Sequence, residues 1–508
     1  MRIFAAYNNI NYMLRRIRIA LALVFFISIT MLFLDITGCV RTWVGWMAKV
    51  QFLPAVMALN VLVIAALIVV TLIFGRIYCS VVCPLGVMQD IIARLGLRGK
   101  KNRNRYSYST GLAWLRYTML GALVAAIAVG VGLIPALLDP YGAYGRIAQN
   151  LFAPIYGWLN NLLAKVAESQ DSYLFYRTDV WIRDSVTFTI SAVTLIAIAI
   201  LAWRNGRTYC NTICPVGTVL GALARFSWLK PVIDTSKCNS CGLCARRCKA
   251  ACINSKEHRI DYSRCVTCFD CIDNCRQGAI SYRRRRGDKT QSDSTESTAD
   301  ASRRSFLTGL GVLATTAAIE AKSVKVDGGL AVILDKKAPR RVTPIVPPGA
   351  QGVRHLAEHC TGCQLCVAAC PNGVLRPSTK IDHLLRPVSS YERGYCRPEC
   401  TACSEVCPAG AILPITKAEK SSTQIGHAVW VMENCVPLAD GVECGNCARH
   451  CPAGAITMVP SEQGNDSSPK IPAINEERCI GCGACENLCP ARPFSAIYVE
   501  GHEHHRTI

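Results

Sequence analysis

The sequence contains thirty cysteines but no Cys-x-x-Cys-His motif, so covalently attached c-type haem is not indicated. Acidic residues are also scarce, with 35 Asp and Glu against 56 Lys and Arg and a net charge of +21. Such an excess can indicate binding to nucleic acid, but here the basic residues cluster beside long apolar runs. That distribution is typical of membrane topology signals and argues against a nucleic-acid partner.

Twenty-four of the cysteines fall into six groups of four with close, repeated spacing. A small secreted protein would use many cysteines in disulfides, but a disulfide framework does not produce such regular groups. Thiolate ligation of iron–sulfur clusters does. Hydrophobic residues make up 51% of the 508 residues, so we expect part of the chain to lie in a membrane.

Four apolar spans are predicted, at residues 19–34, 52–74, 112–138 and 186–203. The segment before the first span has basic residues and no acid, and the connection after the second is also strongly basic. By the positive-inside rule both are cytoplasmic, which places residues 136–185 outside. This outer segment is rich in Tyr and Trp, as interfacial segments are. It would border a quinone site or serve as a simple interfacial anchor.

A motif, Gly-Arg-x-Tyr-Cys-x-x-x-Cys-Pro, occurs twice at an offset of 131 residues. The membrane part is therefore predicted to be a tandem of two-helix hairpins, with one motif copy past the cytoplasmic end of each. The spacing places the two thiols of a copy about one helical turn apart, and the proline favours a break in the backbone. The four thiols could cycle between redox states, bind a metal, hold a cluster or be structural. They belong to Cys79, Cys83, Cys210 and Cys214.

Two groups of four follow the last span about 27 residues apart and predict a cytoplasmic two-cluster ferredoxin domain. In such domains three close cysteines hold one cluster and the fourth of each group binds the other cluster. One cluster would take Cys238, Cys241, Cys244 and Cys275, and the other Cys265, Cys268, Cys271 and Cys248. The extra thiol of Cys252 could substitute for Cys248. Zinc is disfavoured because zinc knuckles do not show this pattern twice.

Residues 283–301 are rich in Arg and then in Ser, Thr and Asp, which predicts a disordered linker. Arg303 and Arg304 follow, with Phe-Leu and a short apolar run after them, and together these indicate a twin-arginine export signal. That route carries folded proteins and suits domains that acquire clusters before export. The alternative is a basic linker before a fifth apolar helix. The run would be cut near Ala321 or, as we expect, remain as an anchor.

Four more groups of four follow and predict an exported four-cluster domain. The second has one extra residue and the third an eight-residue first gap, but each keeps Cys-x-x-Cys-x-x-x-Cys-Pro. Which groups exchange their fourth cysteine is left open. The motifs are Cys360, Cys363, Cys366 and Cys370; Cys396, Cys400, Cys403 and Cys407; Cys435, Cys444, Cys447 and Cys451; and Cys479, Cys482, Cys485 and Cys489.

These features together resemble a known family. Residues 1–282 resemble the NapH (MauN-like) membrane polyferredoxins, and residues 302–500 resemble the NapG/MauM exported ferredoxins, including Pro347-Pro348-Gly349-Ala350 before the first motif. The chain is similar to a fusion of two usually separate subunits. The resemblance implies a quinol dehydrogenase that passes electrons from membrane quinol to a periplasmic reductase or c-type cytochrome, as in the periplasmic nitrate reductase system. Relatives of the membrane half also occur in maturation of metalloenzymes, so a maturation or regulatory redox factor, or a scaffold relay subunit, is the alternative.

The expected fold is a membrane α-helical bundle of four spans plus a twin-arginine signal anchor, with two bacterial-ferredoxin-like α+β modules. The expected parts are the membrane domain (1–230), the cytoplasmic ferredoxin domain (231–282), the linker (283–301), the signal anchor (302–322) and the periplasmic four-cluster domain (338–508). The expected cofactors are six [4Fe–4S] clusters, the expected substrate is quinol, and the expected location is a bacterial inner membrane.

Overall fold

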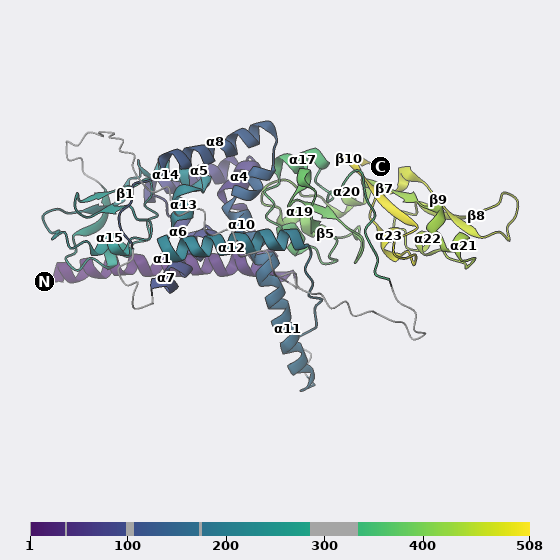
Figure 1. Ribbon diagram of the computed structural model, residues 1–508, viewed down its shortest axis with the longest axis horizontal. Coiled ribbons are helices and arrows are strands. Elements are labelled where there is room, and N and C mark those ends of the chain that lie inside the picture. The colour runs from purple at the N-terminus through teal and green to yellow at the C-terminus, as the bar shows by residue number, and fades with distance from the viewer. Residues whose placement is uncertain (1, 36–37, 98–105, 172–174, 285–333) are drawn as a thin grey trace, which may run out of the picture. The chain divides into compact units, whose positions relative to one another are not determined.

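Two helices in the computed structural model are long and apolar enough to cross a membrane (Figure 1). They are α1 (Arg2–Leu34), over its stretch Met13–Leu34, and α12 (Ser185–Asn205). Only about a quarter of each apolar window is buried, 28% in α1 and 22% in α12. The core helix of a water-soluble protein would bury most of its apolar side chains, so these two helices present apolar surface outward.

The structure describes residues 2–35, 38–97, 106–171, 175–284 and 334–508. The expected twin-arginine segment, with Arg303 and Arg304, lies outside the described residues, as does the expected linker from residue 285 onward. Residues 283 and 284 of that linker belong to a strand instead. The described residues before 285 and after 336 belong to one compact unit.

The other two expected spans are each divided into two helices. Residues 52–74 form α4 (Phe52–Met57) and α5 (Val61–Phe74), because Leu59 takes a positive φ and the Asn60 side chain caps α5 by accepting from Val63 N. Residues 112–138 form α8 (Ala113–Val129) and α9 (Leu133–Leu138), which Gly130 separates in the left-handed region. Four uninterrupted spans are therefore not present in this part of the structure.

The two copies of the repeated motif fold alike. Each begins with a short helix, α6 (Tyr78–Val81) or α13 (Thr208–Thr212), that carries the first cysteine. The proline after the second cysteine then starts a new helix, α7 (Pro84–Leu97) or α14 (Pro215–Ala224). Proline suits this first position because its missing N–H has no partner there anyway. The backbone break predicted at the proline is confirmed in both copies.

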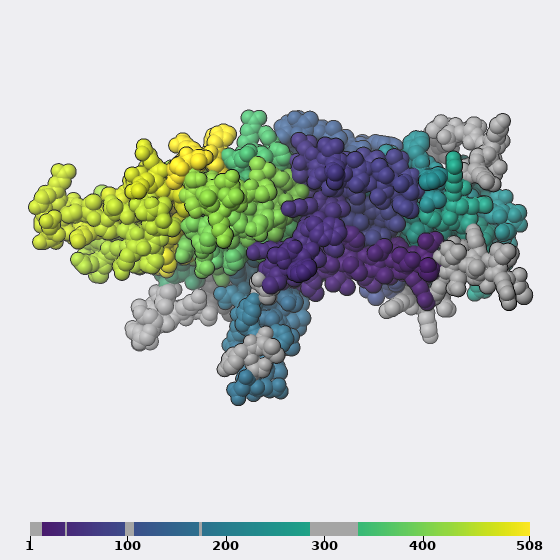
Figure 2. Space-filling model, turned by 180° about the vertical axis from the view of Figure 1, so that it is seen from behind, coloured from purple at the N-terminus to yellow at the C-terminus, as the bar shows by residue number. Residues whose placement is uncertain are grey.

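The segment after α9 continues as three joined helices. They are α10 (Pro140–Ile147), the π-helical turn η2 (Ala148–Phe152) and α11 (Ala153–Glu168). Helix α11 projects away from its neighbours (Figure 1, Figure 2) and exposes large apolar side chains on much of its surface. Two short helices, α2 (Cys39–Val44) and α3 (Trp46–Lys49), connect α1 to α4.

Residues 229–284 form a small α+β domain, named here the N-terminal cluster module. Strands β1 (Leu229–Ile233) and β4 (Ile280–Arg284) pair antiparallel across its two ends. Between them lie α15 (Leu243–Arg247), the paired strands β2 (Ile253–Asn254) and β3 (Arg259–Ile260), and α16 (Asp270–Asp273). Each short helix carries the third cysteine of a motif.

Residues 338–508 form the C-terminal cluster module, which consists of two α+β halves. The first half contains α17 (Val353–His359), α18 (Leu365–Ala369), the pair β5 (Leu375–Pro377) and β6 (Pro387–Ser389), the turn η3 (Ile381–His383) and α19 (Ala402–Val406). The second contains α20 (Lys417–Ser422), η4 (Met432–Asn434), α21 (Val436–Ala439), α22 (Asn446–Arg449), η5 (Glu476–Arg478), α23 (Ala484–Leu488), the pair β8 (Ile456–Pro460) and β9 (Lys470–Ile474), and the pair β7 (Thr423–Trp430) and β10 (Ile497–Thr507).

Candidate functional site

The N-terminal cluster module brings its eight motif cysteines together as two groups, each built from both motifs. Cys244 lies within electrostatic range of Cys238, Cys241 and Cys275, and burial raises the pKa of its thiol to about 11. The second group surrounds a small apolar cavity. Its members are Cys248, Cys265, Cys268 and Cys271, with Cys252 beside them. Each group thus takes the fourth cysteine from the other motif.

Cys252 is a fifth thiol at the second group. Its sulfur lies 3.5 Å from the Cys248 sulfur, and its side chain is only 1% exposed. The hydrogen bond between the two sulfurs lowers the pKa of Cys248 to about 7, and a hydrogen bond with Cys252 also lowers the pKa of Cys265. The pKa of Cys252 itself is raised well above its usual value. Because the thiolate is the form that binds iron, Cys248 is the better ligand of the two.

We expect Cys252→Ser to retain its full iron content, whereas Cys248→Ser should lose one cluster, about four irons per chain. The reason is that Cys248 already carries the thiolate character that ligation requires. Iron and acid-labile sulfide on the anaerobically purified protein measure this. Loss of iron in Cys252→Ser alone would assign the ligand to Cys252 instead.

The C-terminal cluster module resolves the pairing that the sequence leaves open. Motif one exchanges its last cysteine with motif two, and motif three exchanges with motif four. The first half forms the groups Cys360, Cys363, Cys366 and Cys407, and Cys396, Cys400, Cys403 and Cys370. The second half forms the groups Cys435, Cys444, Cys447 and Cys489, and Cys479, Cys482, Cys485 and Cys451.

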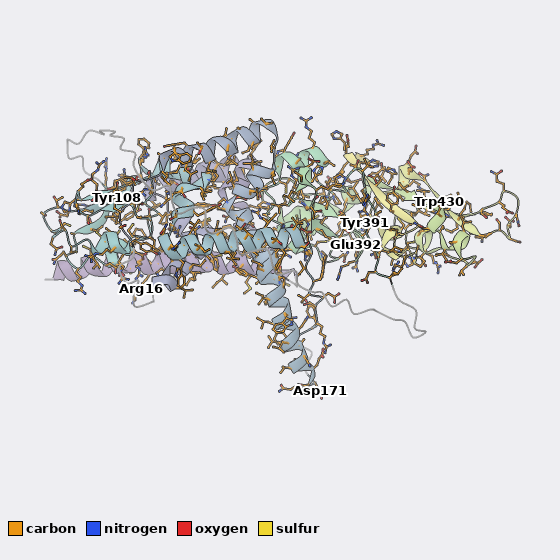
Figure 3. The ribbon with its side chains drawn as sticks, viewed as in Figure 1. Arg16, Tyr108, Asp171, Tyr391, Glu392 and Trp430 are labelled. Atoms are coloured by element: carbon orange, nitrogen blue, oxygen red, sulfur yellow. The ribbon has the colours of Figure 1, made fainter. Side chains whose placement is uncertain are left out.

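The two halves of the C-terminal module meet through motifs two and four. The backbone N–H of Cys396 donates to the carbonyl of Cys482 at 2.9 Å. Tyr391, labelled in Figure 3, is fully buried, and its hydroxyl donates to the Gly481 carbonyl at 2.7 Å. We name each group by the motif that supplies three of its four thiols. The spatial order of the groups is therefore one, two, four, three.

Among the described residues, no group of three or more His, Cys, Asp or Glu side chains could hold a single metal ion. A cubane cluster binds each cysteine sulfur to a different iron and so keeps the four sulfurs apart. Zinc draws its ligands around one atom.

The repeated membrane motifs bring four further thiols together, and we call this group the four-thiol site. All four side chains are buried. Cys83 lies within electrostatic range of Cys79 and Cys210, and Cys214 lies within range of the other three. Two side-chain donors approach sulfur: Gln89 Nε2 lies 3.3 Å from Cys210 Sγ and Arg76 Nη2 lies 3.7 Å from Cys79 Sγ.

The two motif copies exchange arginines across the four-thiol site. Arg76 of the first copy donates to the Cys210 carbonyl of the second at 3.2 Å, and Arg207 of the second donates to the Cys79 carbonyl of the first at 2.5 Å. Both arginines are 0% exposed. The sequence motif contains this arginine in both copies, and its repetition beside Tyr-Cys is the signal that could have assigned it a role.

Asp90 holds several cations between the four-thiol site and the N-terminal module. Its carboxylate accepts from Arg207 Nε at 2.7 Å, lies 3.3 Å from Lys249 Nζ and pairs with Arg18. Lys249 also pairs with Asp270 at 2.9 Å. Burial raises the pKa of Asp270, but Lys249 and the other cations lower it overall. This buried network was not found from the sequence because its members are far apart in the chain.

A cavity of about 690 Å³ lies against the C-terminal module. The end of α1, the π-helical turn, the start of α11 and residues 178–183 line it, together with the loop that carries Cys370. The guanidinium of Arg393 lies over the Trp181 ring, 4.4 Å from its centroid. Gln149 is 6% exposed, and its Oε1 has no hydrogen-bond partner among the described residues. The volume is within the range of small-molecule sites.

Comparison with known families places iron–sulfur binding in both halves of the chain. The model described as a 4Fe-4S binding domain matches residues 56–104 and 187–233, which contain the two membrane motifs. A 4Fe-4S dicluster domain matches residues 442–492, and another 4Fe-4S binding domain matches residues 354–376. The dicluster match agrees with the exchange between motifs three and four.

Individual relatives are described as an electron transport protein and as ferredoxin-type proteins. The chain is 26% identical over 200 residues to YccM of Escherichia coli (strain K12), which covers 39% of this chain and 47% of that protein. It is 28% identical over 179 residues to the methylamine utilization ferredoxin-type protein MauN of Methylobacillus flagellatus, covering 34% of this chain and 48% of MauN. The matches thus span about half the length of these two relatives.

A third relative is covered over its whole length. The ferredoxin-type protein NapF of Escherichia coli (strain K12) is 29% identical over 179 residues, which covers 35% of this chain and 100% of NapF. No solved structure matches the chain. With these 4Fe-4S domain matches and these relatives, the chain is an iron–sulfur electron-transport protein related to YccM, MauN and NapF.

Proposed function

We propose that the chain is a membrane-bound quinol dehydrogenase that passes electrons through the C-terminal module to a periplasmic reductase or c-type cytochrome. The observation that carries this proposal is the cavity beside Cys370. The cavity is lined by residues at the end of α1 and the start of α11, both apolar helices. It is also lined by Cys370, which belongs to the motif-two group. A quinol head group in this cavity would therefore lie next to a cluster ligand.

The membrane location is supported by exposed apolar surface. Helices α1, α11 and α12 all expose large aliphatic or aromatic side chains, which would be costly in water over so large a continuous area. Helix α11 is rich in such residues and also carries polar ones, as helices that lie at a membrane interface do. In this arrangement a lipid-soluble quinol reaches the cavity along α11.

The cavity lining supplies the groups that quinol oxidation needs. A quinol loses two electrons and two protons when it becomes a quinone. Gln149 Oε1 is an acceptor for a quinol hydroxyl, and the carboxylates of Asp35 and Asp179 also lie on the lining. Trp181 offers an aromatic face to the ring. Bound clusters take up and release single electrons, which is the chemistry they supply here.

We expect Gln149→Leu to slow reduction of the clusters by a menaquinol analogue about tenfold, because one hydrogen bond to the substrate is lost. Electron paramagnetic resonance of the anaerobically purified protein follows the reduction. Dithionite should still reduce the same clusters fully, which separates a substrate effect from cluster loss.

Asn160→Leu is the matched control, since Asn160 lies on α11 but outside the cavity lining. It should leave the quinol rate unchanged. Equal rates in wild type and Gln149→Leu would remove Gln149 from the site, and no quinol reduction in wild type would contradict the proposed function.

A further inference from the structure

The four-thiol site contacts the N-terminal cluster module directly. Arg76, whose Nη2 lies beside Cys79 Sγ, donates through Nη1 to the Ser263 carbonyl at 3.1 Å, two residues before Cys265. Asn211, the neighbour of Cys210, donates to the Ala250 carbonyl at 3.3 Å. Single side chains therefore connect the four-thiol site to the backbone around the Cys248 and Cys265 ligands.

The opposite side of the four-thiol site faces the C-terminal module across one helix. Tyr209, next to Cys210, lies within electrostatic range of Asp139 and Arg146 of α10 and its cap. Arg146 in turn donates to the Gly362 carbonyl at 3.3 Å, between the ligands Cys360 and Cys363. Helix α10 contacts α7 and α12, while its Gly145 closely approaches the Cys363 carbonyl.

The charges around the four-thiol site favour an anion there. Arg207 is neutralised by Asp90, but Arg76 is fully buried and forms no salt bridge among the described residues. A buried cation without a counter-charge is strongly unfavourable. Four thiolates bound to iron would supply negative charge at this place, and the donors Gln89 and Arg76 already point at two of the sulfurs.

We infer that Cys79, Cys83, Cys210 and Cys214 together hold one iron–sulfur cluster, and that this cluster joins the N-terminal and C-terminal cluster modules into a single path for electrons across the membrane. A one-electron reductant of the ferredoxin or flavodoxin class is oxidised at the N-terminal module. The acceptor on the other side gains the same electron, and no bond or proton changes. The inference rests on the proposed membrane location but not on quinol oxidation.

Metal analysis tests the ligand assignment. Cys79→Ser and Cys210→Ser should each lose one cluster, about four irons per chain, with matching sulfide, while the signals of the six ferredoxin-type clusters persist. The matched control is Cys39→Ser, because Cys39 lies in the same half of the chain but outside the four-thiol site. Unchanged iron in both variants, or zinc or copper in place of iron, would overturn the assignment.

Electron transfer across a bilayer tests the path. The full chain is placed in quinone-free phospholipid vesicles that enclose oxidised cytochrome c, and dithionite is added outside. Wild type and Cys39→Ser should reduce the enclosed cytochrome, while Cys79→Ser should do so at least tenfold more slowly. In detergent solution, dithionite should still reduce the remaining clusters of Cys79→Ser. Equal rates for Cys79→Ser and wild type would overturn the inference. Because the vesicles lack quinone, a failure of the proposed quinol activity cannot produce either result.

A milder variant covers the case in which the serine variants do not fold. Gln89→Leu keeps all four thiols and removes one donor from Cys210 Sγ. It should retain full iron and lower the midpoint potential of one cluster, since hydrogen bonds to sulfur raise that potential. If redox titration finds every midpoint unchanged, no cluster is bound at Cys210 and the inference fails.

Discussion

Replacing Gly483 by alanine should remove one cluster from the C-terminal module. Gly483 lies between the motif cysteines Cys482 and Cys485 in the left-handed region, with φ +77°. A Cβ there would overlap the ring of Tyr391, which is fully buried and cannot swing aside. The turn must therefore move and take its ligands with it. We expect a loss of about four irons per chain and about 2–4 kcal/mol of stability.

The matched control is Gly454→Ala. Gly454 also has a positive φ, +59°, and also follows a cluster ligand, but no heavy atom lies within 4 Å of the added Cβ. Only the backbone penalty of about 1 kcal/mol applies there, so iron content should be unchanged. Iron analysis and thermal unfolding monitored by cluster absorbance compare the two. If both variants keep all their iron, the Tyr391 contact does not hold the turn.

Removing the charge of Asp90 should have the largest effect on the first half of the chain. Asp90→Asn leaves Arg207, Arg18 and Lys249 buried around a neutral side chain. Breaking a buried ion pair from one side typically costs about 3–5 kcal/mol, because the remaining charges lose their compensation. Since Lys249 belongs to the N-terminal module, the attachment of that module to α7 should weaken as well. Thermal unfolding in detergent and limited proteolysis measure the two effects.

Glu168→Gln is the control for Asp90→Asn. Glu168 pairs with Arg177 at 2.6 Å, but the two side chains are 37% and 64% exposed. An exposed pair contributes at most about 1 kcal/mol. A similar loss of stability in both variants would mean that Asp90 is solvated and does not organise a buried network.

Cysteine spacing alone was sufficient to define the ferredoxin groups, because ligands to one cluster must lie close together along the chain. It could not give the exchange of fourth cysteines in the C-terminal module, which depends on how halves pack. The long first gap of motif three still allows its cysteines to form one group. The helix α21 (Val436–Ala439) occupies part of this gap, and Cys435 lies in the same group as Cys444.

The first half of the chain was less predictable. Hydropathy detects apolar residues but not the positive φ of Leu59 or the left-handed Gly130, which divide two of the expected spans. The cavity as a whole was also hidden, since Asp35, Gln149 and Arg393 come from three distant segments. The aromatic residues of 136–185 marked one of these segments, but only folding brings the three side chains together.

The strand β10 has a consequence for how the protein is made. It pairs with β7, and Gly352 and Arg341 near the start of the module also contact its backbone. While the ribosome has not yet released the residues of β10, the C-terminal module therefore lacks this strand. Translation of this module must reach the end of β10 before β10 can pair with β7 and complete the enclosure of the cysteine groups.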